Sequence, residues 1–510
     1  MVIYKNKRKK REKERKMKNK YSLKNRKNRK NKKTKTIKNK KHTKLSNSKT
    51  KSKSKSKTYN KNGWKYIAIY GHPRERGRQY GLACAKDFKD IQKMLAFFIM
   101  ETYGKPWEYF IREVCEDFKD MTKKDYPEFY EEMQGIAEGC VKGGTDTNID
   151  EILTWNFYLS IPYWYSTRSE TSVGKEGGGG SGGGGGAKMW PGQGATDHCS
   201  AIIAVGPDFT EDGGIVVAHN SFTDFIDGQY SNIVLDITPE PGRGARILMQ
   251  TSPCWIWSGT DFFITSAGII GTETTIGGFF PYKKRIPIGY RIRTAMQYGK
   301  TLDDYTRILL EGNSGDYANS WLFGNIHTNE ILRIELGLEY HNIERTKNGY
   351  FIGFNAAYDP RIRNLECVNS GFYDIRRHQG ARRVRLEELI TQYKGRLNVE
   401  IAKKIIGDHY DVYLKKANNP CSRTVCSHYD LDAREYMSQV GRPAPKSLHG
   451  ALDGIVIDSK MAKQMSFWGR WGNSCGIPFY AEKFCKENIQ WANFCDYLHD
   501  RPTQPWSLFK

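Results

Sequence analysis

Apolar residues recur at intervals of three and four in the first third of the chain. This spacing is typical of helices with one buried face. It predicts three helices, over residues 79–100, 128–140 and 150–159. In the first helix the buried face would carry Phe88, Ile91, Leu95 and Phe98. A short apolar run at 66–69 predicts that the ordered chain begins near Trp64.

From residue 201 onward the pattern changes to short apolar runs separated by turn residues such as Asp212-Gly213-Gly214. These runs predict strands over 201–205, 215–218, 233–237, 247–249, 262–265, 269–276, 321–323 and 331–336. Helical spacing returns at 302–310 and 382–393. Helices followed by many strands with interspersed helices predict an α+β fold rather than a doubly wound parallel sheet.

The net charge of +25 over 510 residues comes from the beginning of the chain. Residues 1–58 hold 28 Lys and Arg against Glu12 and Glu14, whereas the remainder holds 53 basic and 54 acidic residues. With so few apolar residues, this tail is predicted to be disordered. It could bind nucleic acid or an anionic surface, serve as a nuclear address, or be a low-complexity extension without function. The charge balance of residues 59–510 does not favour a polyanion partner.

Several signals of secretion are missing from the sequence. We find no signal peptide, no run of eighteen apolar residues and no N-x-Ser/Thr sequon. Eleven Cys, an odd number spread over a long chain, do not suggest a disulfide framework, although one or two bridges remain open. These features predict a location in the cytoplasm or in a particle rather than in the lysosome, and no membrane-spanning segment.

The region before residue 199 suggests a cleavable segment. Residues 174–186 are nearly all Gly, which predicts a flexible linker within an N-terminal segment, 59–198. His198-Cys199 follows, at the start of a predicted strand. If the 198–199 bond breaks, the α-amine of Cys199, with a pKa of about 7.7–8.0, can act as base for its own thiol, of pKa about 8.5. A Cys at the start of a strand is more often a core residue, so the pattern alone leaves both interpretations open.

Five stretches within residues 64–508 carry a family resemblance. They are 131–139, 199–201 with 218–222, 265–276, 313–321, and 450–454 with 461–463. In this order they resemble the phospholipase B-like proteins and the related isopenicillin N acyltransferase family, both of which are N-terminal-nucleophile (Ntn) hydrolases. The resemblance implies a four-layer αββα sandwich and a catalytic subunit, 199–510, that begins at Cys199.

The resemblance also implies roles for individual residues. Cys199 would be the nucleophile and, through its amine, the base, and His219 and Asn220 would orient the amine and the thiol. Asn313 or Asn319 would donate to the oxyanion, an interaction worth about 3 kcal/mol. Further possible site residues are Thr274, Thr275, Arg376 and Arg377.

Each of these residues also has an ordinary structural interpretation. A lone buried His such as His219 is more often a core residue, and Asn-Ser-Gly at 313–315 is a common turn sequence. Arg376 and Arg377 could form surface ion pairs.

A second cluster of metal-ligating residue types follows Asp408-His409. Cys421, Cys426 and His428 lie close together, but without a second Cys/His pair they match zinc motifs poorly. We therefore predict a structural role for them and no metal or other cofactor. Phosphate-binding loops and the HExxH and GxSxG motifs are absent from the sequence.

Together these observations predict an autoprocessed acyl hydrolase that cuts fatty-acyl ester or amide bonds through a thioester on Cys199. Its partners would be a lipid or acyl-amide substrate, and its two fragments would stay associated after cleavage. The alternatives are an acyltransferase with an amine acceptor, a non-catalytic protein that holds nucleic acid with its tail, and an uncleaved relic without activity.

Overall fold

The chain is described here from a computed structural model that covers residues 56–169, 199–368, 370–432 and 446–510, all within one unit that spans residues 54–510. Most of the predicted tail, the Gly-rich linker 174–186 and His198 lie outside the described residues.

Strands β1 (Lys57–Lys61) and β2 (Trp64–Gly71) open the described chain as a hairpin. The ordered chain therefore begins before Trp64 and includes the last two residues of the predicted tail. The N-terminal helices are α2 (Pro73–Tyr103), α3 (Trp107–Asp125), α4 (Pro127–Lys142), α5 (Ile149–Asn156) and α6 (Ile161–Ser169), with a 3₁₀ turn, η1 (Tyr158–Ser160), before α6. The predicted helices at 79–100 and 128–140 are confirmed, whereas the one at 150–159 is divided between α5 and η1.

Helices α2 and α4 cross at four glycines that contact the opposing backbone. Gly77 and Gly81 lie on α2, and Gly135 and Gly139 lie on α4; a spacing of four puts each pair on one helix face. A Cβ added at any of them would lie 2.0–2.4 Å from a carbonyl oxygen of the other helix. Side chains larger than hydrogen are therefore excluded from this crossing.

The first sheet has nine strands in the order β1-β2-β5-β6-β7-β8-β9-β10-β11. Its further strands are β5 (Ile233–Pro239), β6 (Ile247–Thr251), β7 (Phe262–Thr265), β8 (Ile269–Thr275), β9 (Asn319–Asn325), β10 (Glu330–Leu336) and β11 (His341–Thr346). All neighbours are antiparallel except β2 and β5, which are parallel.

The second sheet has seven strands, all antiparallel, in the order β12-β3-β4-β14-β15-β16, with β13 paired to β4. They are β3 (Cys199–Val205), β4 (Val216–Asp224), β12 (Gly349–Gly353), β13 (His449–Ala451), β14 (Asp453–Asp458), β15 (Phe467–Trp471) and β16 (Ser507–Phe509). The two largely antiparallel sheets together with the helices confirm the α+β prediction.

Alternate residues of β3 pack into two different cores. Ala201 and Ile203 belong to the large cluster that contains residues of the nine-stranded sheet, and Gly324 of β9 lies against Ile203. Ile202 and Ala204 belong to a second cluster with residues of α10 (His378–Gln392) and α11 (Val399–Ile406). The strand is therefore covered by a sheet on one face and by helices on the other, which explains its continuous apolar run.

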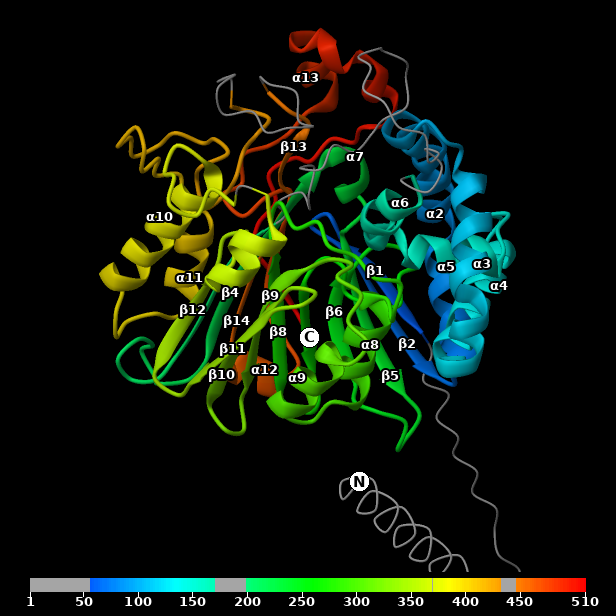
Figure 1. The fold of residues 1–510 in the computed structure, drawn as a ribbon, viewed down its shortest axis with the longest axis horizontal. Coiled ribbons are helices and arrows are strands. Elements are labelled where there is room, and N and C mark those ends of the chain that lie inside the picture. The colour runs from blue at the N-terminus through cyan, green and yellow to red at the C-terminus, as the bar shows by residue number, and fades with distance from the viewer. Residues whose placement is uncertain (1–55, 170–198, 369, 433–445) are drawn as a thin grey trace, which may run out of the picture. The chain divides into compact units, whose positions relative to one another are not determined.

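The remaining helices cover the outer surfaces of the sheets. Helices α8 (Ile288–Tyr298) and α9 (Leu302–Leu310) lie beside the nine-stranded sheet, where Tyr305 packs on Phe323. Figure 1 shows α2–α5 on one side of the sheets and α10 and α11 on the opposite side. Shorter elements are α7 (Phe225–Gly228), η3 (Ile362–Glu366), α12 (Ser459–Lys463), α13 (Ala481–Glu487) and η5 (Ile489–Tyr497).

One disulfide, Cys485–Cys495, joins α13 to η5, and the other nine cysteines are free. A single bridge agrees with the one or two that the cysteine count left open. Among the described helices, none is both long enough and apolar enough to cross a membrane.

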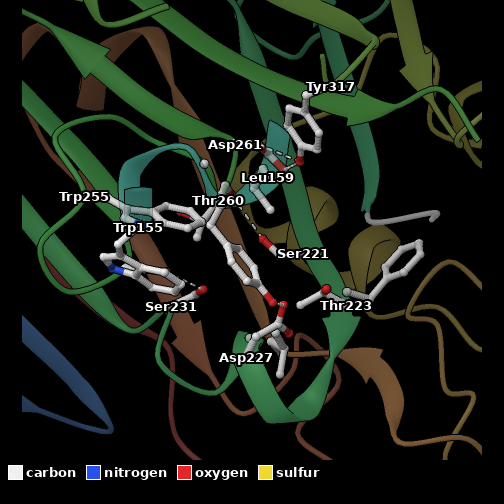
Figure 2. Close-up of a pocket in the computed structure, with 16 residues that line it drawn as sticks. Trp155, Leu159, Ser221, Thr223, Asp227, Ser231, Trp255, Thr260, Asp261 and Tyr317 are labelled. Carbon is white, nitrogen blue, oxygen red and sulfur yellow. Dashed lines mark hydrogen bonds between the residues drawn. The ribbon is translucent and has the colours of Figure 1, made fainter. Parts of the chain in front are cut away.

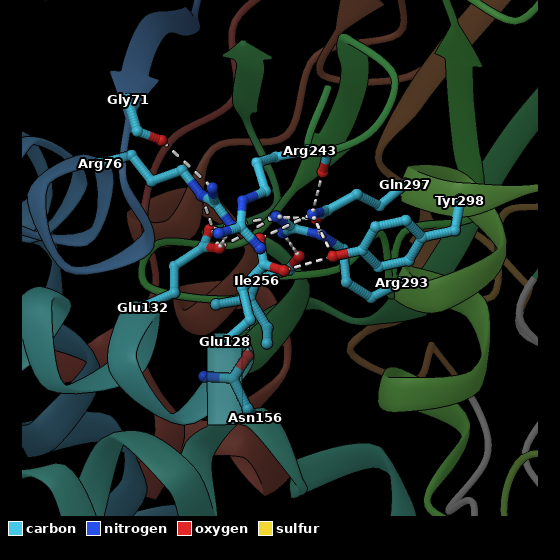
Figure 3. Close-up of polar contacts among 10 residues, drawn as sticks. All are labelled: Gly71, Arg76, Glu128, Glu132, Asn156, Arg243, Ile256, Arg293, Gln297 and Tyr298. Atoms are coloured by element: carbon cyan, nitrogen blue, oxygen red, sulfur yellow. Dashed lines mark hydrogen bonds and ion pairs between the residues drawn. The ribbon is translucent and has the colours of Figure 1, made fainter. Parts of the chain in front are cut away.

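A buried ion network joins α2 and α4 to α8 (Figure 3). Glu132 on α4 is 1% exposed and accepts hydrogen bonds from Arg76 of α2 at 2.8 Å and from Arg293 of α8 at 3.0 Å. Glu128, one turn earlier, accepts from Arg76 and from Gln297 of α8, at 2.8 and 2.7 Å. The network connects the N-terminal helices to the chain beyond residue 199.

We expect Glu132→Gln to lower the free energy of unfolding by about 3–5 kcal/mol, because it leaves two buried guanidinium groups without their shared counter-charge. Urea unfolding followed by tryptophan fluorescence measures this. Glu131→Gln, at the exposed neighbouring position, is the control and should change stability by less than about 0.5 kcal/mol. Equal destabilisation by the two variants would contradict the assignment.

Candidate functional site

Cys199 lies in β3 opposite Ser221 of β4, and its side chain is fully buried. Because side chains alternate along a strand, Cys199 shares the face of Ala201 and Ile203, which looks toward the nine-stranded sheet. The thiol is therefore placed between the two sheets.

The Cys199 thiol is surrounded by polar groups. Its Sγ donates to Oδ2 of Asp261 at 3.3 Å, and the same carboxylate oxygen accepts from the Tyr317 hydroxyl at 3.1 Å. His219 of β4 offers a ring nitrogen within 4.8 Å of both the sulfur and the Asp261 carboxylate. A thiol, an imidazole and a carboxyl thus converge in one buried site.

The main chain of Cys199 is held by two further residues. Its backbone N–H donates to Oδ1 of Asn355 at 3.4 Å, and its carbonyl oxygen accepts from Nη1 of Arg382 at 2.7 Å. Nη2 of Arg382 also donates to Oδ1 of Asn355 at 2.7 Å, so the two side chains brace one another. Nδ2 of Asn355 donates to the Thr275 carbonyl at 2.7 Å, which ties this group to β8. Arg382 lies on α10 and is fully buried.

Three residues of this site have left-handed backbone conformations. The φ angles are 74° at Asp261, 67° at Tyr317 and 66° at Asn355. Asn and Asp tolerate this region, but a Tyr there is an outlier that only the surrounding structure can maintain. Strain of this kind gathers at functional sites, and its coincidence with Cys199 supports a functional role.

Burial dominates the electrostatics of the site. Burial, together with the charges of Asp261 and Glu273, raises the pKa of the Cys199 thiol well above its ordinary value. Burial raises the pKa of Asp261 to about 7, although hydrogen bonds from Glu273, Cys199 and Tyr317 oppose the shift. Burial lowers the pKa of His219 to about 3. Near neutral pH the site therefore holds a thiol, a neutral imidazole, the Asp261 carboxyl and a second buried carboxyl, Glu273, whose pKa burial and the charge of Asp261 raise well above its ordinary value.

His219 and Asn220 face opposite sides of β4. His219 lies on the thiol side, whereas Asn220 lies on the side of α11, where its Oδ1 accepts from the Ser200 N–H at 3.0 Å. Nδ2 of Asn220 donates to the Val425 carbonyl at 3.1 Å. The structure thus brings His219 to the thiol and uses Asn220 to support the strand behind it.

The two candidate oxyanion donors differ in their surroundings. Asn313 is engaged in its own turn: its Oδ1 accepts from the Gly315 N–H and its Nδ2 donates to the Gly337 carbonyl. Asn319 is fully buried beside Thr275, and within the described chain its amide has no hydrogen-bond partner. Asn319 is therefore the one of the two that has a donor to spare.

Of the four further candidates, the two threonines lie on β8 near Asn355, and the two arginines lie just before α10. Thr274 packs against Gly353 of β12, and the Thr275 carbonyl holds Asn355. Arg376 is exposed and pairs with Asp374, which agrees with its ordinary interpretation, and Arg377 precedes α10 as its N-cap.

A pocket lies beside the site (Figure 2). Its lining includes Asp261 and Tyr317 at one end, Ser221, and apolar side chains that include Trp155, Leu159, Trp255 and Leu452. Cys199 itself is not in the lining, but its thiol donates to Asp261, which is. The pocket wall is built from both sides of the predicted cut, since Trp155 and Leu159 precede it.

In the described parts of the chain, two groups of side chains have the composition and spacing to hold a metal ion. One is Cys199 with His219 and Asp261, and the other is His409, Cys426, His428 and Cys475. The first is equally suited to proton transfer, because its thiol already donates to its carboxylate.

Sequence reasoning missed Asp261, Tyr317, Asn355 and Arg382. Tyr317 lies within the 313–321 stretch of the resemblance, where only the two asparagines have an implied role. Arg382 was predicted as the start of a helix, and Asp261 and Asn355 carried no spacing signal. The available clue was the position of Arg382 one turn before Leu386, on the helix face that also carries Leu389 and Ile390.

Comparison with known proteins gives two distant relatives. Human phospholipase B-like 1 is 23% identical over 328 residues, which is 59% of this chain and 55% of that protein. An uncharacterized protein of Archaeoglobus fulgidus is 26% identical over 264 residues, 50% of this chain and 40% of that protein. The chain thus covers less than two thirds of either relative. No protein-family model matches it. These matches support a distant relationship to a phospholipase B-like protein.

We expect the Asp261 carboxyl to make stability fall as pH rises. With a pKa of about 7 in the fold and about 4 when unfolded, it binds more protons in the folded chain between these values, so the free energy of unfolding decreases there. Asp261→Asn removes this contribution to the slope, while the buried Glu273 carboxyl, whose pKa is also raised, keeps its own. Relative to its parent, the variant should gain on the order of 3 kcal/mol from about pH 4 to about pH 8.

Urea unfolding at several pH values tests this, with Cys199→Ala as the parent so that no cleavage intervenes. Burial is the largest cause of the shift and survives loss of the thiol. Asp125→Asn, at an exposed position, is the control and should run parallel to the parent, whereas a parallel Asp261→Asn curve would refute the expectation.

Proposed function

We propose that the chain is a self-processing acyl hydrolase of the phospholipase B-like kind, with Cys199 as its nucleophile. The observation that carries the proposal is the Cys199 thiol in β3, donating to a carboxyl with a pKa of about 7 that also lines a pocket. The match to phospholipase B-like 1 supports a hydrolase-type function. The Ntn architecture, the cut and the substrates belong to the proposal.

The processing step would use Asp261 as its base. Before cleavage Cys199 has no free amine, and its thiol has a raised pKa. The ionised Asp261 carboxylate takes the thiol proton while sulfur attacks the carbonyl carbon of residue 198. The C–N bond then breaks, the Cys199 nitrogen gains a proton, and a thioester forms. Water hydrolyses this thioester, which leaves a carboxylate at residue 198 and restores the thiol.

After cleavage the Cys199 α-amine would act as the base. Asn355 already accepts from this nitrogen, so it is placed to orient the amine, and Arg382 fixes both Asn355 and the Cys199 carbonyl. Sulfur attacks the acyl carbonyl, the alcohol or amine leaves with the proton, and water releases the acid. The spare Nδ2 of Asn319 is our candidate donor to the oxyanion.

The arrangement of layers fits this proposal. Two largely antiparallel sheets lie against each other, α8 and α9 cover one, and α10 and α11 cover the other. We infer that this is the four-layer αββα sandwich of Ntn hydrolases. The cut would fall between the N-terminal helices and β3.

The fragments would remain associated after the cut. β2 is inserted in the nine-stranded sheet beside β5, and Glu132 binds Arg293 across the proposed boundary. Both contacts are buried and independent of the linking peptide.

The pocket suggests the substrate class. Its apolar side chains suit a hydrocarbon chain, and of its two polar ends the one at Asp261 and Tyr317 adjoins the thiol, while Asp227 lies at the other. We therefore propose fatty-acyl esters or amides. An amine acceptor in place of water would give an acyltransferase by the same acyl-enzyme, and nucleic-acid binding by the basic tail remains a separate prediction.

We expect purified chain to contain a fragment that begins Cys199-Ser200-Ala201, and Cys199→Ala to yield only uncut chain. Intact mass and N-terminal sequencing measure both. Cys254→Ala, at another fully buried cysteine, is the matched control and should still be cut. Active wild-type preparations that contain only uncut chain would remove the proposal.

We expect the cleaved protein to release fatty acid from acyl ester or amide substrates, and Asn319→Ala to lower kcat by about 10²- to 10³-fold, because it removes an oxyanion donor. Asn313→Ala should leave kcat near wild type. The released products, measured with and without added amines, separate hydrolysis from acyl transfer. A larger loss in Asn313→Ala would reverse the assignment of the donor.

A further inference from the structure

Four side chains from separate segments converge behind the strand that carries Cys199. His409, Cys426 and His428 lie in the irregular segment after α11, and Cys475 follows β15. Each offers one ligand atom, and these atoms all lie within 4.8 Å of one another. We call this group the Cys2His2 cluster.

The distances within the Cys2His2 cluster fit a tetrahedral ion. Nε2 of His428 lies 3.4 Å from Sγ of both Cys426 and Cys475, and the rings of His409 and His428 are 5.1 Å apart. In a tetrahedral zinc site, with bonds of about 2.3 Å to sulfur and 2.0–2.1 Å to nitrogen, sulfur and nitrogen are separated by about 3.6 Å. The observed separations need only small adjustments.

Neighbouring residues hold the side chains of the cluster in position, as is usual for metal ligands. Nδ1 of His428 lies 3.5 Å from the Asp430 carboxylate, the carboxylate–histidine arrangement common at zinc sites. The Ser474 hydroxyl donates to the Ile406 carbonyl at 2.7 Å and lies 3.2 Å from Cys426 Sγ, and the Ile477 N–H donates to Cys475 Sγ at 3.4 Å.

The charge and the burial of the four side chains also favour a divalent cation. Cys426 and His428 are buried, and Nε2 of His409 is a buried ring nitrogen without a hydrogen-bond partner in the described chain. Two thiolates and two neutral imidazoles would cancel the charge of one divalent cation, and binding would release the two thiol protons. His409 and Cys475 are partly exposed, which leaves a path for the ion.

We propose that His409, Cys426, His428 and Cys475 bind one Zn²⁺. Two sulfur and two nitrogen ligands in tetrahedral array select zinc among the common divalent ions. Four protein ligands leave no open position, so the ion is structural.

The zinc ion would fix the layer behind the nucleophile strand. The Val425 carbonyl, next to Cys426, accepts from Ser200 at 3.0 Å and from Asn220 at 3.1 Å. Ser474, next to Cys475, accepts from Asn220 at 3.4 Å. The ion would join the two segments that hold β3 from behind. This inference does not depend on cleavage at Cys199.

The test measures zinc in the full-length chain by mass spectrometry of the metal, in wild type and in Cys199→Ala, which disrupts the other group of potential ligands. We expect one zinc per chain in both. After removal with a chelator, a Co²⁺ titration should saturate at one equivalent and give the absorption bands of tetrahedral thiolate coordination.

Cys475→Ser should lose the zinc and the cobalt bands, whereas Cys421→Ser should keep both. Cys421 is the matched control, because it is a buried cysteine of the same segment whose Sγ points to Asp411 instead. Asp430→Asn, which leaves all four ligands, should weaken metal binding by about 10- to 100-fold.

Two results would overturn the proposal. One is a chain with free thiols at Cys426 and Cys475 that binds neither zinc nor Co²⁺. The other is a Cys426–Cys475 disulfide, found by peptide mapping without reductant. Both results can be obtained even if Cys475→Ser fails to fold, because they are measured on the wild-type chain.

Discussion

Strand β3 has no face in water, and the site depends on this constraint. Its odd-numbered residues pack toward the other sheet and its even-numbered residues toward α10 and α11. A shift of register by one residue would turn the Cys199 thiol away from Asp261 and toward the helices. Asn220 and Ser200 hold the register from the helix side, and Arg382 holds it through the Cys199 carbonyl. The thiol and its supports thus occupy opposite sides of the same two strands.

Much of the fold follows from local patterns. The strand at 262–265 and the helix at 302–310 match the prediction residue for residue, because each has a strong pattern with clear ends. The predicted end of β4 at Ala218 is too early. The strand continues to Asp224 through His219 and Asn220, which are polar yet buried. Helix α3 was missed despite its regular apolar face, and the pairing of β2 with β5 has no local signal.

The site was predictable only where residue type and family resemblance agreed. Cys199 and His219 come together as expected, while Asn220 was assigned to the thiol although the alternation of β4 already excluded it. Asp261, Asn355 and Arg382 reach Cys199 from distant segments. Likewise, the sequence trio Cys421, Cys426 and His428 looked incomplete because Cys475 joins His428 only in three dimensions. Residues that converge from distant segments produce no pattern in the spacing of residue types along the sequence.

The parallel ladder between β2 and β5 bears on the order of events in the life of the chain. Tyr66 pairs with Val234, so the nine-stranded sheet is complete only after residues on both sides of position 199 have been synthesised and brought together. Such non-local pairings form late in folding. The neighbours that would set the chemistry of Cys199 also come from distant segments, at Asp261, Asn355 and Arg382, so they too meet only after long-range contacts have formed. Under the proposed function, scission there would therefore follow this long-range assembly, and a nascent polypeptide would be protected from severing itself prematurely.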